Sequence, residues 1–340
     1  MKKTIITLIT VLALNMSAFA QCGNFTWKIE NDTLTISGEG EMCDYTLQTW
    51  WDWPPWFSWE STITAIVIEN GITRIGDFAF FVLHSATSVS IPNSVTSIGK
   101  GSFGSCESLP SITLPNSITS IGGSVFAGCA NLTSIDVESE NNSYASEDGV
   151  LFDKNKITLI CCPEGKTGDY VIPNSVKTIG SWAFYYCENL TSITIPNSVK
   201  SIEDKAFGYC KKLKLITNLN PIPIVIDSDV FYEMNIKECT LEVPINSVDA
   251  YRNAAVWKEF NIVGVEVGIE ETDYYPSLRI YPNPTIGKVY LETESSIKVY
   301  DVRGVFLMET FGNQVDLSVY PQGVYLLQVN GGRWIKVVRQ

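Results

Sequence analysis

The sequence repeats itself with a period of 23 residues, and this periodicity limits the folds that the chain can adopt. The block I-P-N-S-V-T-S-I-G at residues 91–99 recurs in related form at residues 114–122, 172–180 and 195–203. Burying the seven apolar side chains of one repeat yields on the order of 10–20 kcal/mol, whereas ordering 23 residues costs roughly 35 kcal/mol. One repeat therefore cannot fold alone, and the stability must belong to a stack of repeats.

The apolar positions between these blocks are also fixed. A phenylalanine, a cysteine and a leucine recur in the pattern x-x-F-x-x-C-x-x-L, for example at Phe103, Cys106 and Leu109. Residues 190–196 fit the L-x-x-L-x-L strand of leucine-rich repeats, and a second short strand is expected at residues 95–98. The sequence thus predicts a mainly β leucine-rich-repeat solenoid with Phe103, Phe126, Phe184 and Phe207 aligned along its interior.

These two blocks and their spacing resemble the BspA-like leucine-rich repeat proteins of bacterial cell surfaces. The resemblance spans residues 22–267. We expect an N-terminal cap at residues 21–66 and the solenoid, with a C-terminal cap, at residues 67–267. The resemblance implies attachment to host matrix proteins or to other bacteria.

One insertion and two caps interrupt the repeat pattern. Residues 137 and 172 are 35 apart instead of 23, and the insertion at residues 141–170 predicts a hairpin whose turn lies at residues 153–156. At the N-terminal end, residues 27–37 predict a strand pair that turns at Asn31-Asp32. At the other end, residues 241–244 predict the last strand, and residues 246–260 predict a helix capped by Ser247 or Asn246.

The first twenty residues have the pattern of a cleaved secretory signal: Lys2 and Lys3, an apolar run at residues 5–14, and Ala18-Phe19-Ala20. We expect the mature chain to begin at Gln21 and not to span a membrane, because the apolar run is shorter than the ~20 residues that a bilayer requires. Lipidation of Cys22 is the alternative, but Gln21 stands where a small residue is needed.

The C-terminal part loses the repeat pattern. Residues 268–276 indicate a linker, and residues 277–340 predict short strands of a small immunoglobulin-like β-sandwich. The motifs in this segment resemble the type A sorting domain of the type IX secretion system. This resemblance implies export across an outer membrane after Sec-dependent entry, removal of the domain, and release or attachment to surface lipopolysaccharide. The motif residues are Tyr281, Pro282, Asn283, Pro284, Gly287, Asp301, Gly304, Gly323, Tyr325 and Lys336.

Charge and cysteine usage exclude several functions. The net charge of −13 disfavours nucleic acid and anionic membranes as partners. Cys106 and Cys129 occupy one slot of the repeat, which favours buried free thiols over a zinc site, since His84 is the single histidine. Cys22 and Cys43 are a possible disulfide pair. We expect no metal and no cofactor.

Two sets of residues are candidates for ligand binding. The first set consists of the side chains between the inward positions of each strand: Ser88, Ser90, Ser111, Thr113, Ser134, Asp136, Ser192 and Thr194. These hydroxyls either bind a ligand or pair across a regular sheet, and the sequence favours the second reading. The second set is Trp51, Trp53 and Trp56, in a tryptophan-rich run at residues 50–59 that either stacks on carbohydrate or closes the first repeat. The sequence favours the cap, because an end needs covering.

The sequence offers little support for catalysis. One histidine excludes most Ser-His and Cys-His schemes. The acidic pairs Glu138/Glu140 and Glu147/Asp148 leave a hydrolase as the weakest hypothesis. The sequence therefore predicts a non-enzymatic, exported surface protein that binds extracellular protein ligands. The alternative is a glycan-binding accessory protein that uses the tryptophan-rich run.

Overall fold

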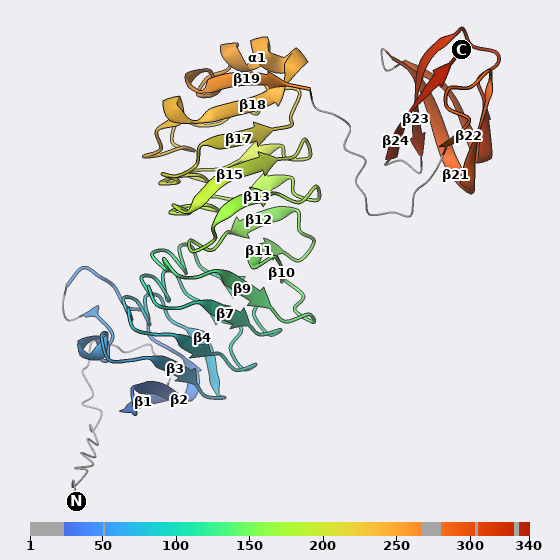
Figure 1. Ribbon diagram of the computed structural model, residues 1–340. Coiled ribbons are helices and arrows are strands. Elements are labelled where there is room, and N and C mark those ends of the chain that lie inside the picture. Colours follow the sequence, from blue (N-terminus) through green and yellow to red (C-terminus); the bar gives the residue numbers. More distant parts are fainter. Residues whose placement is uncertain (1–23, 50–51, 267–279, 303–304, 330–332) are drawn as a thin grey trace, which may run out of the picture. The chain divides into compact units, whose positions relative to one another are not determined.

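The computed structural model describes residues 24–49, 52–266, 280–302, 305–329 and 333–340. The chain divides into two compact units, residues 1–266 and residues 267–340. The first unit is a solenoid of short parallel strands (Figure 1), which confirms the predicted mainly β repeat fold. Among the described residues, no helix is long and apolar enough to cross a membrane.

The first strand of each repeat pairs in parallel with the equivalent strand of a neighbouring repeat. Ile112 pairs with Ile135, and Ile193 pairs with Ile216, so residues 23 apart lie side by side. These strands are β3 (Ala65–Ile68), β5 (Ser88–Ser90), β7 (Ser111–Leu114), β9 (Ser134–Val137), β13 (Gly168–Val171), β15 (Leu190–Ile195), β17 (Leu215–Asn218), β18 (Thr240–Pro244) and β19 (Asn261–Val265).

A second series of parallel strands runs along the other side of the repeats. It comprises β4 (Ile72–Ile75), β6 (Ser97–Ile98), β8 (Ser120–Ile121), β12 (Thr158–Cys161), β14 (Thr178–Ile179) and β16 (Ser201–Ile202). The predicted strand at residues 95–98 begins only at Ser97, because the amide of Val95 donates to the carbonyl of Pro92 in a turn (3.1 Å).

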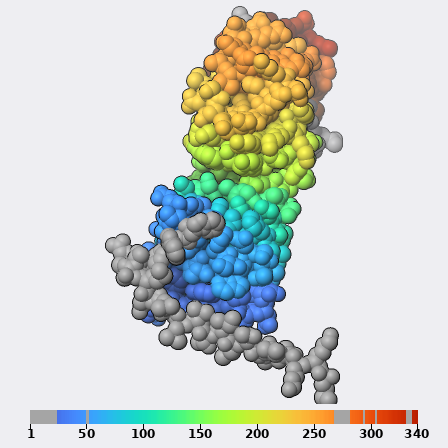
Figure 2. Space-filling view, turned by 90° about the vertical axis from the view of Figure 1, so that its left-hand side faces the viewer, coloured from blue at the N-terminus to red at the C-terminus, as the bar shows by residue number. Residues whose placement is uncertain are grey.

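The turn that leads from each second strand to the next first strand carries the recurring phenylalanine and cysteine. The amide of Phe103 donates to the carbonyl of Val125 in the following turn (3.1 Å). The Cys129 thiol donates to the carbonyl of Phe103 in the preceding repeat (3.1 Å). The turns are thus joined by hydrogen bonds as regularly as the strands, and they form one side of the solenoid, which Figure 2 views. We call this side the turn face.

The N-terminal cap is the predicted strand pair. β1 (Asn24–Glu30) and β2 (Thr33–Glu41) are antiparallel, and Asn31 and Asp32 turn the chain in left-handed conformations (φ 48° and 59°). Trp56 precedes the short helix η2 (Phe57–Trp59) and is fully buried, with its indole nitrogen 2.9 Å from the carbonyl of Ala79. Trp56 thus packs against the interior of the first repeat, where its ring stacks on that of Phe80.

The C-terminal cap differs from the prediction in two respects. The α-helix α1 (Val248–Asn253) ends well before residue 260, and η5 (Trp257–Glu259) follows it. The chain breaks between them because Val256 adopts a left-handed conformation (φ 66°) and Trp257 turns inward, donating to the carbonyl of Ile224 (2.7 Å). In addition, the last strand is β19 rather than residues 241–244. The remaining short helices are η3 (Ile236–Glu238) and η4 (Ile245–Ser247), and the Ser247 hydroxyl donates to Pro221 rather than capping α1.

The insertion forms an antiparallel meander of β10 (Tyr144–Glu147), β11 (Val150–Asp153) and β12, which confirms the predicted hairpin and adds a strand to it. The meander separates two buried clusters. Leu151 belongs to the cluster of the earlier repeats, and Val150 and Phe152 belong to that of the later ones. We therefore distinguish an N-terminal stack (residues 24–137), a junction (138–167) and a C-terminal stack (168–266).

The second unit has a core of its own. Its described strands are antiparallel: β20 (Ile280–Tyr281), β21 (Lys288–Asp301), β22 (Phe306–Asp316), β23 (Gly323–Val329) and β24 (Arg333–Arg339). β21 pairs with β20, β22 and β23, and β23 pairs with β24. This arrangement is compatible with the predicted immunoglobulin-like domain.

Candidate functional site

The outward side chains of the first strands form an exposed surface, which we call the strand face. In β7, Ile112 and Leu114 are buried while Ser111 and Thr113 are exposed, as the alternation of a strand requires. Ser111 pairs with Ser134, and Thr113 pairs with Asp136. The other predicted positions, Ser88, Ser90, Ser192 and Thr194, are likewise exposed or half-buried. The insertion separates Ser192 and Thr194, in the C-terminal stack, from the others.

Hydrogen bonding distinguishes the strand face from other hydroxyls of the solenoid. The hydroxyls of Thr87, Thr119 and Thr133 each donate to a carbonyl 23 residues earlier, at 3.1–3.2 Å. Within the described residues, the side chains of Ser88, Ser90, Ser111 and Thr113 make no such bond to the protein. The first group of hydroxyls holds the stack together, whereas the second group is free to bind solvent or a ligand.

The strand face of the C-terminal stack is more acidic. Asp169 accepts a hydrogen bond from the Thr191 hydroxyl (3.0 Å), and hydrogen bonds from Ser192 and Thr191 lower the pKa of its carboxyl group. The Thr217 hydroxyl donates to Glu242 (2.8 Å). These carboxylates are held in place by hydroxyl donors on neighbouring strands.

The described tryptophan side chains of residues 50–59 expose too little ring area to form a ligand-binding patch. Trp56 has no exposed area, so its assignment as a ligand-binding residue is wrong. The Trp53 ring is half-buried, with its centroid 4.1 Å from that of Phe57. Trp59 is 37% exposed and lies against Trp27. Trp51 lies outside the described residues.

The turn face of the C-terminal stack carries exposed aromatic rings that the sequence analysis missed. Trp182 contacts Tyr185 (4.3 Å between centroids), Tyr186 stacks on Tyr209 (4.5 Å), and Tyr209 contacts Tyr232 (5.6 Å). We call these five residues the aromatic ridge. Lys205 lies over the rings of Trp182 and Tyr232, at 5.1 and 5.5 Å. The signal was present in the sequence, because Tyr186, Tyr209 and Tyr232 recur at the 23-residue period, but sequence reasoning considered only the apolar interior positions of the repeat.

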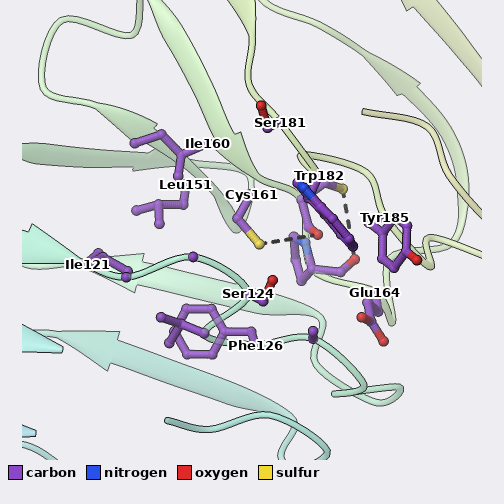
Figure 3. A pocket seen from close by; sticks show the side chains of 16 residues that line it. Ile121, Ser124, Phe126, Leu151, Ile160, Cys161, Glu164, Ser181, Trp182 and Tyr185 are labelled. Atoms are coloured by element: carbon purple, nitrogen blue, oxygen red, sulfur yellow. Dashed lines mark hydrogen bonds between the residues drawn. The ribbon is translucent and has the colours of Figure 1, made fainter. Parts of the chain in front are cut away.

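A cavity of about 200 Å³ lies at the junction, next to the aromatic ridge. Figure 3 shows Phe126 and Ile121 on one wall, Leu151, Ile160 and Cys161 on another, and Trp182 and Tyr185 at the rim. The one acidic residue in its lining is Glu164, whose carboxyl oxygen accepts a hydrogen bond from the amide of Gly128 (2.7 Å). Burial raises the pKa of Glu164 to about 8, and burial also raises the pKa of the Cys161 thiol. Both groups are therefore uncharged at neutral pH.

Of the four other acidic candidates, Glu140 is exposed, and Glu138, Glu147 and Asp148 are engaged in structural contacts. Glu138 accepts a hydrogen bond from the amide of Asn116 (2.8 Å), and Glu147 and Asp148 form ion pairs with Lys156 and Lys166 (2.5 and 2.8 Å). Among the described residues, no three His, Cys, Asp or Glu side chains group in a way that could hold a metal ion.

The cysteines divide as the sequence suggested. Cys43 is disulfide-bonded, and its predicted partner, Cys22, lies outside the described residues. The seven later cysteines are free: Cys106, Cys129, Cys161, Cys162, Cys187, Cys210 and Cys239. Burial raises the pKa of Cys106 to about 12 and that of Cys239 to about 11, so these thiols are protonated and behave as core residues.

The sorting-motif residues organise one edge of the second unit. The side-chain amide of Asn283 donates to the carbonyl of Lys336 (2.8 Å) and accepts from the amide of Val338 (2.9 Å). Asp301 accepts from the amide of Val305 (2.9 Å), and the Tyr325 hydroxyl donates to the carbonyl of Pro321. Gly304 lies outside the described residues. The motif thus joins the beginning of the unit to its last strand, β24.

Parallel strands stacked at a 23-residue period around buried phenylalanine and cysteine residues define a leucine-rich-repeat solenoid. The family model of the BspA type leucine-rich repeat region matches residues 55–167 and 165–256, in six copies. The chain therefore belongs to this family. Residues 279–340 match a secretion system C-terminal sorting domain. This domain indicates type IX export, either to the cell surface or into the medium. The chain is thus an exported repeat protein.

Solved structures of bacterial repeat proteins are similar to this chain. A leucine-rich repeat protein from Eubacterium ventriosum is 25% identical, with 65% of this chain and 76% of that chain covered and a TM-score of 0.40. A leucine-rich cell surface protein from Faecalibacterium prausnitzii is 24% identical, with 61% of each chain covered and a TM-score of 0.46. A leucine-rich repeat protein from Bacteroides ovatus is 18% identical, with coverage of 71% and 88% and a TM-score of 0.28. A search of curated proteins found no match.

Proposed function

We propose that this protein is a surface adhesin that binds extracellular protein ligands on its strand face. The proposal depends on the hydroxyls of four exposed residues: Ser88, Ser90, Ser111 and Thr113. These hydroxyls form no hydrogen bond to another described group of the protein. A free hydroxyl both donates and accepts, so a row of them suits the polar rim and backbone of a protein partner.

The charge of the surface selects the partner. The whole chain carries a net charge of −13, and Asp136, Asp169 and Glu242 place carboxylates on the strand face. Complementary charge accelerates encounter and disfavours acidic partners. We therefore expect basic segments of host matrix proteins, or of surface proteins of other bacteria, to be the ligands.

The export route is part of the proposal. The predicted signal at residues 1–20 and the predicted linker at residues 268–276 lie outside the described residues. Most of the sorting domain that follows the linker is described. Sec-dependent entry and cleavage before Gln21 would precede type IX export, after which the sorting domain is removed and the solenoid is released or attached to surface lipopolysaccharide. Mass spectrometry of the native exported protein would identify both termini and any attached glycolipid.

A glycan ligand on the tryptophan-rich run is the alternative. In its favour stands the 37% exposure of Trp59. Against it stand the burial of Trp56 and the packing of Trp53 on Phe57, since stacking on a sugar requires free ring faces.

Binding of the mature chain to immobilised matrix proteins and to bacterial cells tests the proposal, and two matched variants locate the surface. Ser111→Arg places a large cation on the strand face, whereas Ser120→Arg places the same group on an exposed position of the second strand series, β8. We expect Ser111→Arg to weaken binding about tenfold or more and Ser120→Arg to leave it unchanged. Absence of saturable binding to every protein tested, or equal losses in both variants, would contradict the proposal.

A further inference from the structure

The junction cavity marks a position in the stack where one turn is incomplete. Ser192 stands 13 positions after Ile179 in the sequence. Their register partners are Asp169 and Leu159, and Asp169 stands only 10 positions after Leu159. The shortened turn also lacks the phenylalanine: Phe184 stands five residues after Ile179, and Glu164 stands five residues after Leu159. The column of phenylalanine rings therefore stops at Phe126, whose ring lines the cavity.

Elsewhere in the stack, two or three backbone hydrogen bonds join each turn to the next. The amides of Gly101, Phe103 and Ser105 donate to the carbonyls of Gly123, Val125 and Ala127, at 2.7–3.1 Å. In the C-terminal stack, the amides of Trp182, Phe184 and Tyr186 donate to the carbonyls of Asp204, Ala206 and Gly208, at 2.8–3.0 Å. The turn of Phe207 makes two such bonds, from the amides of Phe207 and Tyr209 to the carbonyls of Val230 and Tyr232 (both 2.9 Å).

At the junction, most of the equivalent backbone amides and carbonyls have no hydrogen-bond partner within the described chain. On the N-terminal side, the Gly128 amide donates to a carboxyl oxygen of Glu164, while the equivalent amides of Ser124 and Phe126 have no acceptor among the described residues. On the C-terminal side, the Ala183 carbonyl accepts from Cys162 (2.7 Å), while the equivalent carbonyls of Ser181 and Tyr185 have no protein donor. All four unpaired groups belong to residues that line the cavity.

One wall of the cavity thus presents unpaired amide donors, and the other presents unpaired carbonyl acceptors. A backbone segment that lies between the two walls can form hydrogen bonds with both. Adjacent strands lie about 4.8 Å apart, so two edges with one chain between them are separated by about 10 Å. A volume of 200 Å³ equals that of about six or seven water molecules, enough for one residue with its side chain. The walls that face this residue are the ring of Phe126 and the side chains of Leu151 and Ile160, which favour an apolar or aromatic side chain.

We propose that the junction cavity binds a loop of a protein ligand, which inserts one bulky apolar residue against Phe126 and completes the hydrogen bonds of the interrupted turn. The peptide carbonyls of the loop accept from Ser124 and Phe126, and one of its amides donates to the carbonyl of Tyr185, while the Cys162 amide keeps the carbonyl of Ala183. Trp182 and Tyr185 cover the inserted residue at the rim. This inference rests on the proposed function, since it requires the ligand to be a protein, but it concerns a site separate from the strand face.

Small probes test the site without knowledge of the ligand. We would titrate the mature chain with N-acetyl-phenylalanine methylamide and follow the amide signals of Ser124 and Phe126 by NMR. We expect saturable binding at roughly millimolar concentration, as a ligand of this size allows, with slower hydrogen exchange at both amides. Toluene and N-acetylglucosamine serve as comparison probes for a ring without peptide groups and for a sugar.

Two substitutions at one position distinguish cavity binding from binding elsewhere. Gly123 lines the cavity and a side chain there meets nothing within 4 Å, so we expect Gly123→Leu to occupy the cavity and Gly123→Ala to leave most of it open. We expect Gly123→Leu to weaken probe binding about tenfold or more and Gly123→Ala to retain it. Probe binding that survives Gly123→Leu, toluene binding as tight as that of the peptide probe, or preferential binding of the sugar would each overturn the inference.

The two proposals fail independently. If the blocked phenylalanine does not bind but Ser111→Arg abolishes attachment to a matrix protein, the cavity proposal is wrong and the strand face is supported. If the probe binds but no protein ligand is found in any assay, the adhesin proposal is wrong, and the cavity is a site for a peptide of another origin.

Discussion

The two stacks of the solenoid are alike inside and different outside. In the N-terminal stack, the rings of Phe103 and Phe126 stack with centroids 6.1 Å apart, and in the C-terminal stack those of Phe184 and Phe207 stack at 5.1 Å. On the turn face, by contrast, the positions of Trp182 and Tyr185 hold rings only in the first turn of the N-terminal stack, Phe78 and Phe81, whereas the next two turns have Gly101 and Gly104, then Ser124 and Ala127. Interior residues are constrained by neighbours on both sides, whereas turn residues face solvent on one side. A functional difference between the stacks is therefore to be sought on the turn face and at the junction.

The largest effects are expected from the shared interior. Phe103→Ala and Phe207→Ala each remove a fully buried ring from its column, so each should lower the free energy of unfolding by about 3–5 kcal/mol. The two rings belong to different buried clusters, so their effects should add within about 0.5 kcal/mol. Urea denaturation of the single and double variants measures both quantities.

A third ring provides the control for additivity. Phe126 stacks directly on Phe103, so the pair Phe103→Ala and Phe126→Ala should deviate from additivity by about 0.5 kcal/mol or more. Strong coupling between Phe103 and Phe207 instead would show that the junction transmits packing and that the solenoid has a single core.

The junction should respond to pH in a way that neither stack does. Burial raises the pKa of Glu164 from 4.5 to about 8, so the folded state retains a proton that the unfolded state releases. The wild-type protein should therefore lose stability relative to Glu164→Gln as pH rises from 4.5 to 8, by about 3 kcal/mol at pH 7. The groups that face Glu164 are Cys129, Cys161, Tyr185 and Glu188. Burial keeps the two thiols protonated, and it raises the pKa of Tyr185 to about 12.

Thermal denaturation of the two proteins between pH 4 and 9 tests this prediction. Glu140→Gln is the matched control, because Glu140 is exposed on the same segment of the chain. A constant difference between wild type and Glu164→Gln across this range would show that the Glu164 carboxyl group is ionised in the folded state and that the cavity is wet.

A smaller effect should be equal in both stacks. A methyl group added at Gly104 would lie 2.8 Å from the ring of Phe81, and one added at Gly208 would lie 2.7 Å from the ring of Tyr185. Both rings are half-buried and can turn toward solvent, so Gly104→Ala and Gly208→Ala should each cost about 1 kcal/mol. Differential scanning calorimetry gives both values. A much larger loss for Gly208→Ala would indicate that the aromatic ridge stabilises the C-terminal stack rather than serving as free surface.

The sequence predicted what the repeat dictates and missed what departs from it. The inward positions of the strands and turns follow from periodicity, the hairpin around residues 153–156 from its turn residues, and the burial of Trp56 from the need to seal an end. The C-terminal helix was predicted too long, because spacing alone does not reveal the left-handed turn at Val256. The junction cavity was missed because it depends on a turn three residues shorter than the others and on one buried carboxyl group, Glu164, neither of which repeats.

The smallest effect, with the opposite sign, is expected at the edge of the cavity. The backbone of Gly123 is not left-handed and a methyl group there meets nothing within 4 Å, whereas a methyl group on the adjacent Gly122 would lie 2.5 Å from the backbone nitrogen of Lys100. Gly123→Ala should therefore stabilise the protein by about 0.4–1 kcal/mol by restricting the unfolded chain, and Gly122→Ala should destabilise it by more than that. Equilibrium unfolding of this neighbouring pair is a direct test of open space at the junction, because the two substitutions alter the unfolded chain almost equally. If both variants lose stability, the N-terminal and C-terminal stacks meet more closely than the cavity requires, and the site proposed for a ligand loop does not exist.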